Sequence, residues 1–297
     1  MDEATDILCI GSVLWDVIGK SRAAMRVGSD VPGRITRLPG GVAMNIAMTA
    51  RRFGMRPILL TAVGQDEPGD ALLAFSERLG METTYIYRSE DLPTDSYMAI
   101  EGANGVIAAI ADAHSLEEAG DKILAPLADG RLGSADTPWQ GLVALDGNLT
   151  ETLLAEIAES PLFAKADLRV APASPGKAER LLPFLTTPGA TLYLNLEEAG
   201  LLLRDPQDTA RAAAEALQKR GAGRVLVTDG GREAAELGPN GLFTATPPEV
   251  LVTRVTGAGD TFMAAHIAAE IGGKGAGEAL VSGLAAAAAY VSGDLPT

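Results

Sequence analysis

The chain has 297 residues, 47% of them hydrophobic, which is enough for one large domain with a substantial core. Its net charge of −15 argues against a nucleic acid polymer as a partner, because contacts to the phosphate backbone need a basic surface. A nucleotide ligand stays open, since backbone amides and Mg²⁺ can hold one.

No segment has the character of a targeting or membrane-spanning sequence. The start, Met1-Asp2-Glu3, lacks the basic residues of a signal peptide, and no apolar run reaches the about eighteen residues of a membrane span. The single cysteine, Cys9, lies in an apolar run, so we expect a buried strand residue that forms no intramolecular disulfide. These features predict a soluble cytoplasmic protein that does not bind membranes.

Apolar strand-like runs alternate with helical segments along the chain. We expect strands at Ile7–Ile10, Pro57–Val63, Leu142–Leu145, Leu168–Val170, Thr191–Leu194 and Arg224–Thr228. We expect helices at Met44–Phe53, Ala71–Leu79, Thr150–Ile157, Lys177–Leu185 and Thr209–Arg220. The alternation predicts an α/β fold whose mostly parallel central sheet is flanked by helices, with binding sites at the carboxyl ends of the strands.

Two early segments, residues 13–38 and 84–112, interrupt this alternation. The first is expected to be short and irregular. The second holds three strand candidates, the last two joined by a Gly-Ala-Asn-Gly turn typical of a hairpin: Thr83–Tyr87, Ser96–Glu101 and Val106–Ala111. We expect both segments to form a small β lid within a single domain of residues 1–297. The lid covers the active site in one interpretation and pairs two subunits in the other, and both can hold.

A glycine turn near the C-terminus, residues 256–260, carries the most specific chemistry. Its sequence is Thr-Gly-Ala-Gly-Asp, and a helix is expected to start at Met263. Such a turn directs backbone N–H groups at the N-terminus of a helix, where the helix dipole favours an anion. A carboxylate at Asp260 suits a base that takes a proton from a hydroxyl attacking a phosphoryl group. The alternative is a tight turn in which Asp260 caps the helix.

Two upstream segments carry candidates for binding hydroxyl groups. Gly40 and Gly41 directly precede a helix and allow close approach of the backbone, and Asn45 in the first turns of that helix can both donate and accept hydrogen bonds. Asp16 follows the first strand and can accept hydrogen bonds from vicinal hydroxyls. The alternatives are a solvated asparagine at a loop–helix junction and an aspartate that is a cap or solvated.

Asn195 and Glu198 follow another strand, three residues apart. At the start of a helix this spacing can place both side chains on one face, where they can organise Mg²⁺-bound water near phosphates. A capping box is the structural alternative, because Asn at the N-cap and Glu three residues later fit that motif.

Taken in their order along the chain, these four motifs resemble those of the ribokinase-like (PfkB) family of carbohydrate and nucleoside kinases, and the likeness runs through nearly the whole chain. The resemblance implies ATP as phosphoryl donor and Mg²⁺ as metal. It implies a sugar site, an anion hole with its base, and a nucleotide site with water-mediated Mg²⁺ ligands. It assigns the sugar site to Asp16, Gly40, Gly41 and Asn45. It assigns the anion hole and base to Gly257, Ala258, Gly259 and Asp260. It assigns the nucleotide site to Thr228, Gly230 and Thr256, with Asn195 and Glu198 as the metal ligands through water.

Within the family, the segments 96–112, 143–150 and 171–177 resemble those of pseudouridine kinases. This likeness implies that Ser174 and Lys177 lie near the substrate and that Lys177 donates to a base carbonyl. The alternative for Lys177 is a solvated residue in the first turn of a helix. Ala171 departs from that subfamily, which often has an acidic residue there.

A second departure is Arg254, two residues before Thr256, where the family commonly has an acidic residue that helps to bind a monovalent cation. We hypothesise that this protein does not depend on K⁺ and that the guanidinium supplies the positive charge.

Together these features predict an ATP-dependent kinase that phosphorylates a sugar hydroxyl, with the 5′-hydroxyl of pseudouridine as the preferred candidate. They also predict a homodimer formed through the lid. The alternatives are a related kinase for ribose, a purine nucleoside or a sugar acid, and a non-catalytic sugar or nucleoside sensor. His114 and His266 lack carboxylate neighbours in the sequence and are given no metal or catalytic role, and Trp139 is expected to pack rather than stack on a ligand.

Overall fold

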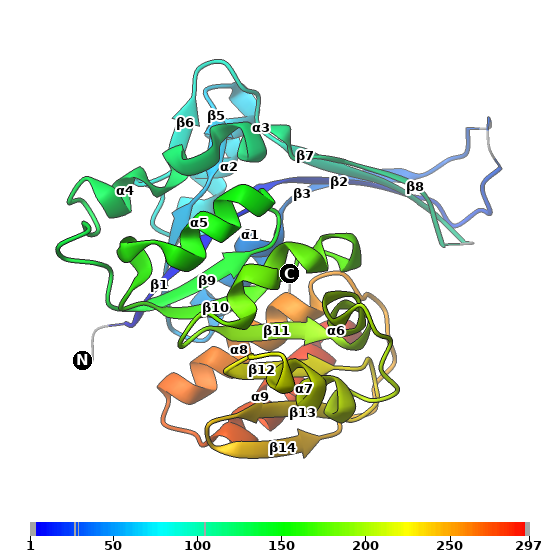
Figure 1. Cartoon of the computed structure of the whole chain (residues 1–297). Helices are drawn as coiled ribbons and strands as arrows, with labels where there is room; N and C mark the ends of the chain where they lie inside the picture. Colours follow the sequence, from blue (N-terminus) through cyan, green and yellow to red (C-terminus); the bar gives the residue numbers. More distant parts are fainter. Residues whose placement is uncertain (1–3, 27, 29, 104, 295–297) are drawn as a thin grey trace.

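The structure is a computed structural model that describes residues 4–26, 28, 30–103 and 105–294. A central sheet of eight strands runs in the order β14-β13-β12-β11-β10-β9-β1-β4 (Figure 1). From β4 to β12 the strands are parallel, and β13 and β14 add an antiparallel edge. The bounds are β1 Asp6–Ile10, β4 Arg56–Leu60, β9 Leu142–Asp146, β10 Asp167–Ala171, β11 Thr191–Asn195, β12 Arg224–Thr228, β13 Ala234–Gly238 and β14 Gly241–Ala245. The predicted α/β fold class is confirmed.

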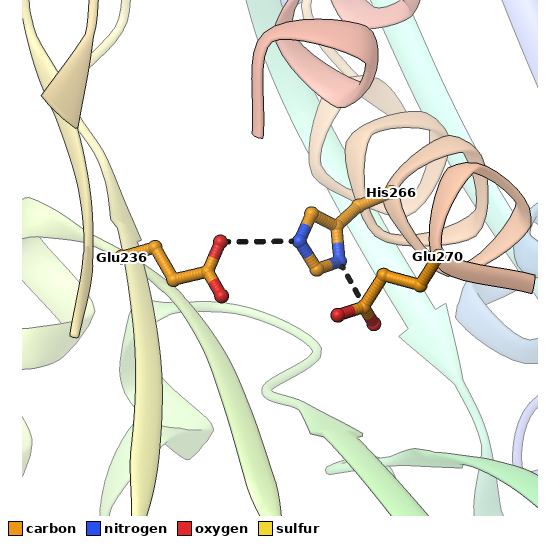
Figure 2. A group of neighbouring side chains, drawn as sticks. All are labelled: Glu236, His266 and Glu270. Carbon is orange, nitrogen blue, oxygen red and sulfur yellow. Dashed lines mark hydrogen bonds and ion pairs between the residues drawn. The ribbon is translucent and has the colours of Figure 1, made fainter. Parts of the chain in front are cut away.

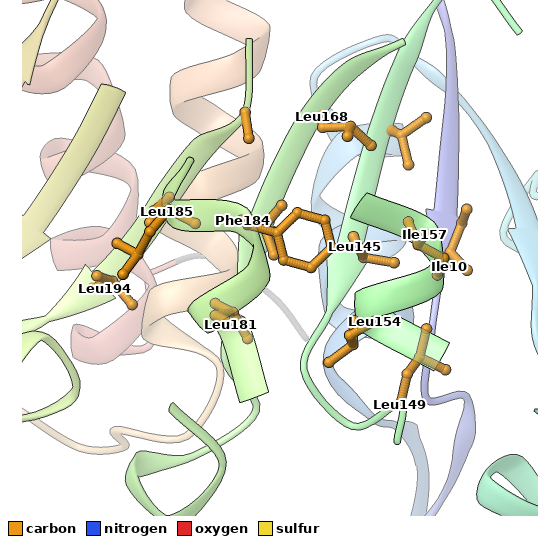
Figure 3. Packing of buried hydrophobic residues seen from close by; sticks show 14 of the residues in the cluster. Ile10, Leu145, Leu149, Leu154, Ile157, Leu168, Leu181, Phe184, Leu185 and Leu194 are labelled. Carbon is orange, nitrogen blue, oxygen red and sulfur yellow. The ribbon is translucent and has the colours of Figure 1, made fainter. Parts of the chain in front are cut away.

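Helices cover both faces of the central sheet, because successive side chains of a strand point to opposite faces. On one face, Leu8 and Ile10 join a core with α3, α4, α5, α6, α7 and the 3₁₀ segments, part of which Figure 3 shows around Phe184. On the other face, Ile7 and the buried Cys9 pack with α1, α2, α8 and α9. The bounds are α1 Val42–Arg52, α2 Glu67–Arg78, α3 His114–Ala119, η1 Gly120–Leu124, α4 Ala125–Ala128, α5 Glu151–Glu159, η2 Pro161–Phe163, η3 Pro175–Leu185, α6 Leu196–Leu203, α7 Ala210–Lys219, α8 Ala258–Ile271 and α9 Ala276–Ser292.

Four strands form a separate sheet that projects from the main body (Figure 1), in the order β3-β2-β7-β8. They are β2 Leu14–Lys20, β3 Arg34–Gly40, β7 Ser96–Gly102 and β8 Gly105–Asp112. The predicted hairpin is thus confirmed, except for residue 104 of its turn, which lies outside the described residues. The expectation that residues 13–38 are irregular is wrong, because β2 and β3 fill much of that range. The sequence of β3 lacks the apolar run of a buried strand, because β3 is largely exposed and lies at the edge of the sheet.

A third, two-stranded sheet pairs β5 Ala62–Gly64 with β6 Tyr87–Ser89. The strand expected at Thr83–Tyr87 is therefore wrong in its bounds, since residues 84–85 form a turn. The strand expected at Pro57–Val63 is divided between β4 and β5. Across the described ranges, no helix combines the length and the apolar character needed to cross a membrane.

Candidate active site

The predicted site residues lie at the carboxyl edge of the parallel strands, where such sheets bind ligands. β9 ends at Asp146, and β11 and β12 end side by side, with Asn195 paired to Thr228. Directly after β1, Gly11 has a φ of +144°, and a Cβ there would lie 2.3 Å from the Cβ of Asp146. Only glycine therefore lets the first loop cross over the end of β9.

Asp16 and Gly40 come from the neighbouring strands β2 and β3 and contact each other. A Cβ at Gly40 would lie 2.1 Å from Oδ2 of Asp16, so this carboxyl group lies directly against the glycine backbone. Burial raises the pKa of Asp16 to about 6. The glycine thus makes room for a half-buried carboxylate at the root of the small sheet.

Gly41 shapes the start of α1 and helps to place Asn45. Its φ is +96°, and a Cβ there would lie 2.4 Å from the carbonyl oxygen of Ser12, so the backbone approach requires glycine. One turn later, Nδ2 of Asn45 donates to Oδ2 of Asp260 over 2.8 Å. Asn45 is therefore directed at the candidate base rather than into solvent.

Helix α8 begins earlier than the sequence suggested, at Ala258 instead of Met263. Its N-cap is Gly257, in the left-handed conformation with a φ of +87°, and the cap has no side-chain hydrogen bond. Asp260 lies inside the first turn, so the alternative that Asp260 is the N-cap is wrong. The N–H of Ala258 donates to the carbonyl of Val255 over 3.1 Å. This one amide is engaged within the turn, whereas the following amides belong to a first turn that has no intrahelical acceptors.

Asp260 has a pKa raised from 3.8 to about 7. Burial is the largest cause; the hydrogen bond from Asn45 opposes it, and the nearby carboxylates of Asp146, Glu198 and Asp16 raise the pKa further. A carboxylate whose pKa lies near neutral pH is suited to accept a proton.

A buried hydrogen-bond network beside this site was missed at the sequence level. Asp146, with no exposed surface, accepts from the N–H of Ser12 over 2.8 Å and from its Oγ over 2.6 Å. Ser12 Oγ in turn accepts from the N–H of Val42 over 2.9 Å and from Nδ2 of Asn148 over 2.8 Å. These bonds join the ends of β1 and β9 to the start of α1. The position of Asp146 at the end of a buried strand was the available signal.

Lys177 is held by the same network, because its Nζ donates to Oδ1 of Asn148 over 2.6 Å. It is half-buried in the 3₁₀ segment η3, where an α-helix was expected, so the solvated alternative is wrong. Ser174 directly precedes η3 and its side chain makes no capping bond. Its carbonyl accepts from the N–H of Lys177 over 2.9 Å.

Asn195 and Glu198 form a complete capping box at the start of α6, as the structural alternative predicted. Oδ1 of Asn195 accepts from the N–H of Glu198, and Oε2 of Glu198 accepts from the N–H of Asn195, both over 2.8 Å. Burial raises the pKa of Glu198 to about 7. The box uses one carboxylate oxygen of Glu198. Beside it, Thr228 ends β12, and Gly230 in the next loop has a φ of +57°.

A second polar cluster lies between α8 and the central sheet, around His266. Figure 2 shows this side chain between two carboxylates, with Nε2 3.3 Å from Glu236 and Nδ1 3.7 Å from Glu270. The expectation that His266 and His114 lack carboxylate neighbours is therefore wrong, because Nδ1 of His114 also lies 2.9 Å from Oδ1 of Asp112. Arg224 pairs with both glutamates and Arg169 pairs with Glu270. Because guanidinium groups already bind both carboxylate oxygens of Glu270 and one of Glu236, the cluster is suited to tie α8 to the sheet rather than to hold a metal.

Comparisons with known proteins agree with this fold. The model of the pfkB family carbohydrate kinases matches residues 4–294, and the chain belongs to this family. It is thus an ATP-dependent carbohydrate or nucleoside kinase. The chain is 30% identical to the pseudouridine kinase of Escherichia coli (strain K12) over 274 residues, 89% of this chain and 83% of that protein. It is 24% identical to the fructoselysine 6-kinase of the same strain, over 84% of this chain and 88% of that protein.

Solved structures show the same ribokinase-like fold. A carbohydrate kinase from Agrobacterium tumefaciens superposes with a TM-score of 0.80 at 27% identity, covering 96% of this chain and 90% of that one. The Arabidopsis thaliana ribokinase complexed with ribose and ATP has a TM-score of 0.79 at 20% identity, covering 99% and 94%.

Proposed function

We propose that this kinase transfers the γ-phosphoryl group of ATP to the 5′-hydroxyl of pseudouridine. The observation that carries the reaction is the 2.8 Å hydrogen bond between Asn45 and Asp260, which directs a hydroxyl-binding side chain at the candidate base. The likeness to a pseudouridine kinase over 89% of the chain supports the substrate.

In this mechanism Asp260 accepts the proton of the attacking hydroxyl. Asn45 donates to Oδ2 of Asp260, so the other carboxylate oxygen remains to receive that proton. Asp16 and the glycine backbone at Gly40 and Gly41 hold the ribose hydroxyls. The amides of the turn at 257–260 other than that of Ala258, which is engaged with Val255, stabilise the charge that develops on the transferred phosphoryl group.

Lys177 is the candidate for recognising the base. An ammonium group donates three hydrogen bonds, and Asn148 accepts one of them, so others remain for a carbonyl of the base. Ser174 lies next to it at the start of η3. A bare sugar has no carbonyl at this position, so this lysine supports a nucleoside substrate over ribose.

The residues at the end of β11 fit a water-mediated Mg²⁺ site. Glu198 is 8% exposed, has one carboxylate oxygen outside the capping box, and lies close enough to Asp260 to raise its pKa. Such a concentration of negative charge suits a divalent cation, and Asn195 and Glu198 would hold its water molecules, with Thr228, Gly230 and Thr256 near the nucleotide. Mg²⁺ supplies charge neutralisation for the phosphates when bound.

The small sheet serves as a lid on one face and a dimer contact on the other. The strand register places Asp16 on one face and Met98, Ile100, Ile110 and Ile35 on the opposite face. These four apolar side chains are 50%, 42%, 69% and 77% exposed. An exposed apolar sheet face and its open edges favour pairing with a second copy of the chain. Light scattering at several protein concentrations tests this, and a Met98→Lys/Ile110→Lys variant should be monomeric.

An assay of ADP release over a panel of acceptors tests the substrate: pseudouridine, uridine, ribose, a purine nucleoside, fructoselysine and a sugar acid. We expect the highest kcat/KM with pseudouridine. Preference for another acceptor would support a kinase of different specificity. Binding of nucleosides with no release of ADP from ATP in the presence of any acceptor would support the sensor alternative, against which the intact Asp260 argues.

A further inference from the structure

The segment 246–257, which joins β14 to α8 and ends in the anion turn, has no helix or strand of its own. Its apolar side chains Leu251, Val252 and Val255 are 83%, 58% and 71% exposed, so burial in the core does not hold it. Phosphoryl transfer nevertheless needs the amides of the turn in a fixed direction. Other contacts must therefore set that direction.

The segment is anchored to the last turn of α9. The N–H and Oγ1 of Thr253 donate to the carbonyl of Val291 over 2.8 and 3.0 Å, and the N–H of Arg254 donates to it over 3.3 Å. Nε of Arg254 donates to the carbonyl of Tyr290 over 2.7 Å. A guanidinium is favoured there because the last carbonyls of a helix lack intrahelical donors and carry the negative end of the helix dipole.

Tyr290 contacts the turn itself. Its hydroxyl donates to the carbonyl of Thr256 over 2.9 Å. That carbonyl and the N–H of Gly257 belong to one planar trans peptide, so fixing the carbonyl also fixes the direction of the N–H. A Cβ at Gly257 would lie 2.7 Å from the tyrosine hydroxyl, so glycine permits this approach. The guanidinium of Arg254 stacks on the ring, 3.9 Å from its centroid.

We propose that Tyr290 is a positioning residue for phosphoryl transfer: its hydroxyl holds the Thr256–Gly257 peptide so that the N–H of Gly257 points at the γ-phosphoryl group, and Arg254 holds the tyrosine ring. The proposal rests on the function proposed above for the anion turn. In addition to carrying a positive charge, Arg254 positions the ring of Tyr290, since its planar guanidinium both stacks and donates a hydrogen bond.

Tyr290→Phe removes the hydroxyl and keeps the ring on which Arg254 stacks. We expect the affinity for the β,γ-imido analogue of ATP and kcat/KM for ATP to fall about 3- to 10-fold, the size of one neutral hydrogen bond. The affinity for ADP, which has no γ-phosphoryl group, should stay unchanged. Tyr85→Phe, in a half-buried tyrosine elsewhere, is the control and should change neither affinity. Equal weakening of both nucleotides, or of neither, overturns the proposal.

Arg254→Lys keeps the charge and loses the planar stacking on the ring. It should also lower the affinity for the ATP analogue and not that for ADP. Because Arg254 acts through the tyrosine, the double variant should bind the analogue no more weakly than Tyr290→Phe alone. Losses of affinity that multiply in the double variant would contradict the proposal. Arg78→Lys, whose guanidinium lies 5.2 Å from the ring of Phe75, is the matched control. Should Tyr290→Phe not fold, selective loss in Arg254→Lys supports the proposal and unselective loss overturns it. Nucleotide binding needs no acceptor. A wild-type chain that is inactive on pseudouridine would therefore contradict the proposed substrate and leave the proposed role of Tyr290 open to this test.

Discussion

Replacing Asp260 by Asn tests the proposed base most sharply, because the change removes the proton acceptor and keeps the shape of the side chain. The carbonyl oxygen of the introduced amide can still accept the 2.8 Å hydrogen bond from Asn45, so the local geometry should persist. Loss of a positioned general base costs ~10²–10⁴-fold in rate. This corresponds to about 2.7–5.4 kcal/mol of activation free energy.

The same substitution should not destabilise the fold. The pKa of Asp260 in the folded protein, about 7, lies above the value of 3.8 for an unperturbed carboxyl. The folded state therefore binds this proton more tightly than the unfolded state, and ionisation of Asp260 costs stability as the pH rises through this interval. A neutral Asn removes that cost, so we expect a Tm at pH 8 no lower than that of the wild type.

The assay measures kcat and KM by ADP release from pH 5.5 to 9, together with thermal unfolding. For the wild type, kcat/KM should fall tenfold per pH unit below about 7, because the base must be ionised. Asp260→Asn should lose this acid limb along with its activity, while the exposed control Asp208→Asn keeps both. An Asp260→Asn protein that retains more than a tenth of wild-type kcat would refute the assignment of the base.

Three further substitutions test other parts of the account. Gly40→Ala should displace the carboxylate of Asp16, which we propose binds the ribose, and lower kcat/KM for the nucleoside about 10- to 100-fold, since a lost hydrogen bond to a charged group costs about 1.5–3 kcal/mol. Gly223→Ala, with open space around it, should leave the steady-state kinetics unchanged. Glu270→Gln should lower the free energy of unfolding in urea by about 2 kcal/mol, because it weakens two partly buried ion pairs. The exposed pair removed by Glu215→Gln should cost about 0.3–0.5 kcal/mol, and equal losses would argue against the cluster as an anchor. Lys177→Met should lower kcat/KM for pseudouridine at least tenfold and leave any turnover of ribose unchanged, and a parallel loss on both acceptors would contradict its contact with the base.

Much of the central sheet was predictable because its strands are buried on both faces. Such strands are continuous apolar runs, as in β1 and β12, and the loops after them hold the candidate ligands. The strand β3 was not predictable in this way, because its Arg34 and Arg37 face solvent at an edge. The antiparallel strands β13 and β14 were missed as well, since Ala and Gly carry little strand propensity.

The site residues were named individually, but their contacts depend on the fold. Asn45 and Asp260 are 215 residues apart in the chain, and no local pattern predicts that they share a hydrogen bond. The hydrogen bond between Ser12 and Asp146, 134 residues apart, depends on the pairing of β1 with β9. The carboxylate Glu236 reaches His266 from an antiparallel strand that the sequence pattern did not reveal. These contacts join residues distant in the sequence, and local motifs therefore do not predict them.

The central claim is phosphoryl transfer from ATP to the 5′-hydroxyl of pseudouridine, and the identity of the product tests it most directly. Incubation of the chain with ATP, Mg²⁺ and pseudouridine, followed by ³¹P NMR and mass spectrometry, should give ADP and pseudouridine 5′-phosphate in equal amounts. Pseudouridine recovered unphosphorylated, while another acceptor of the panel is phosphorylated under the same conditions, would contradict it.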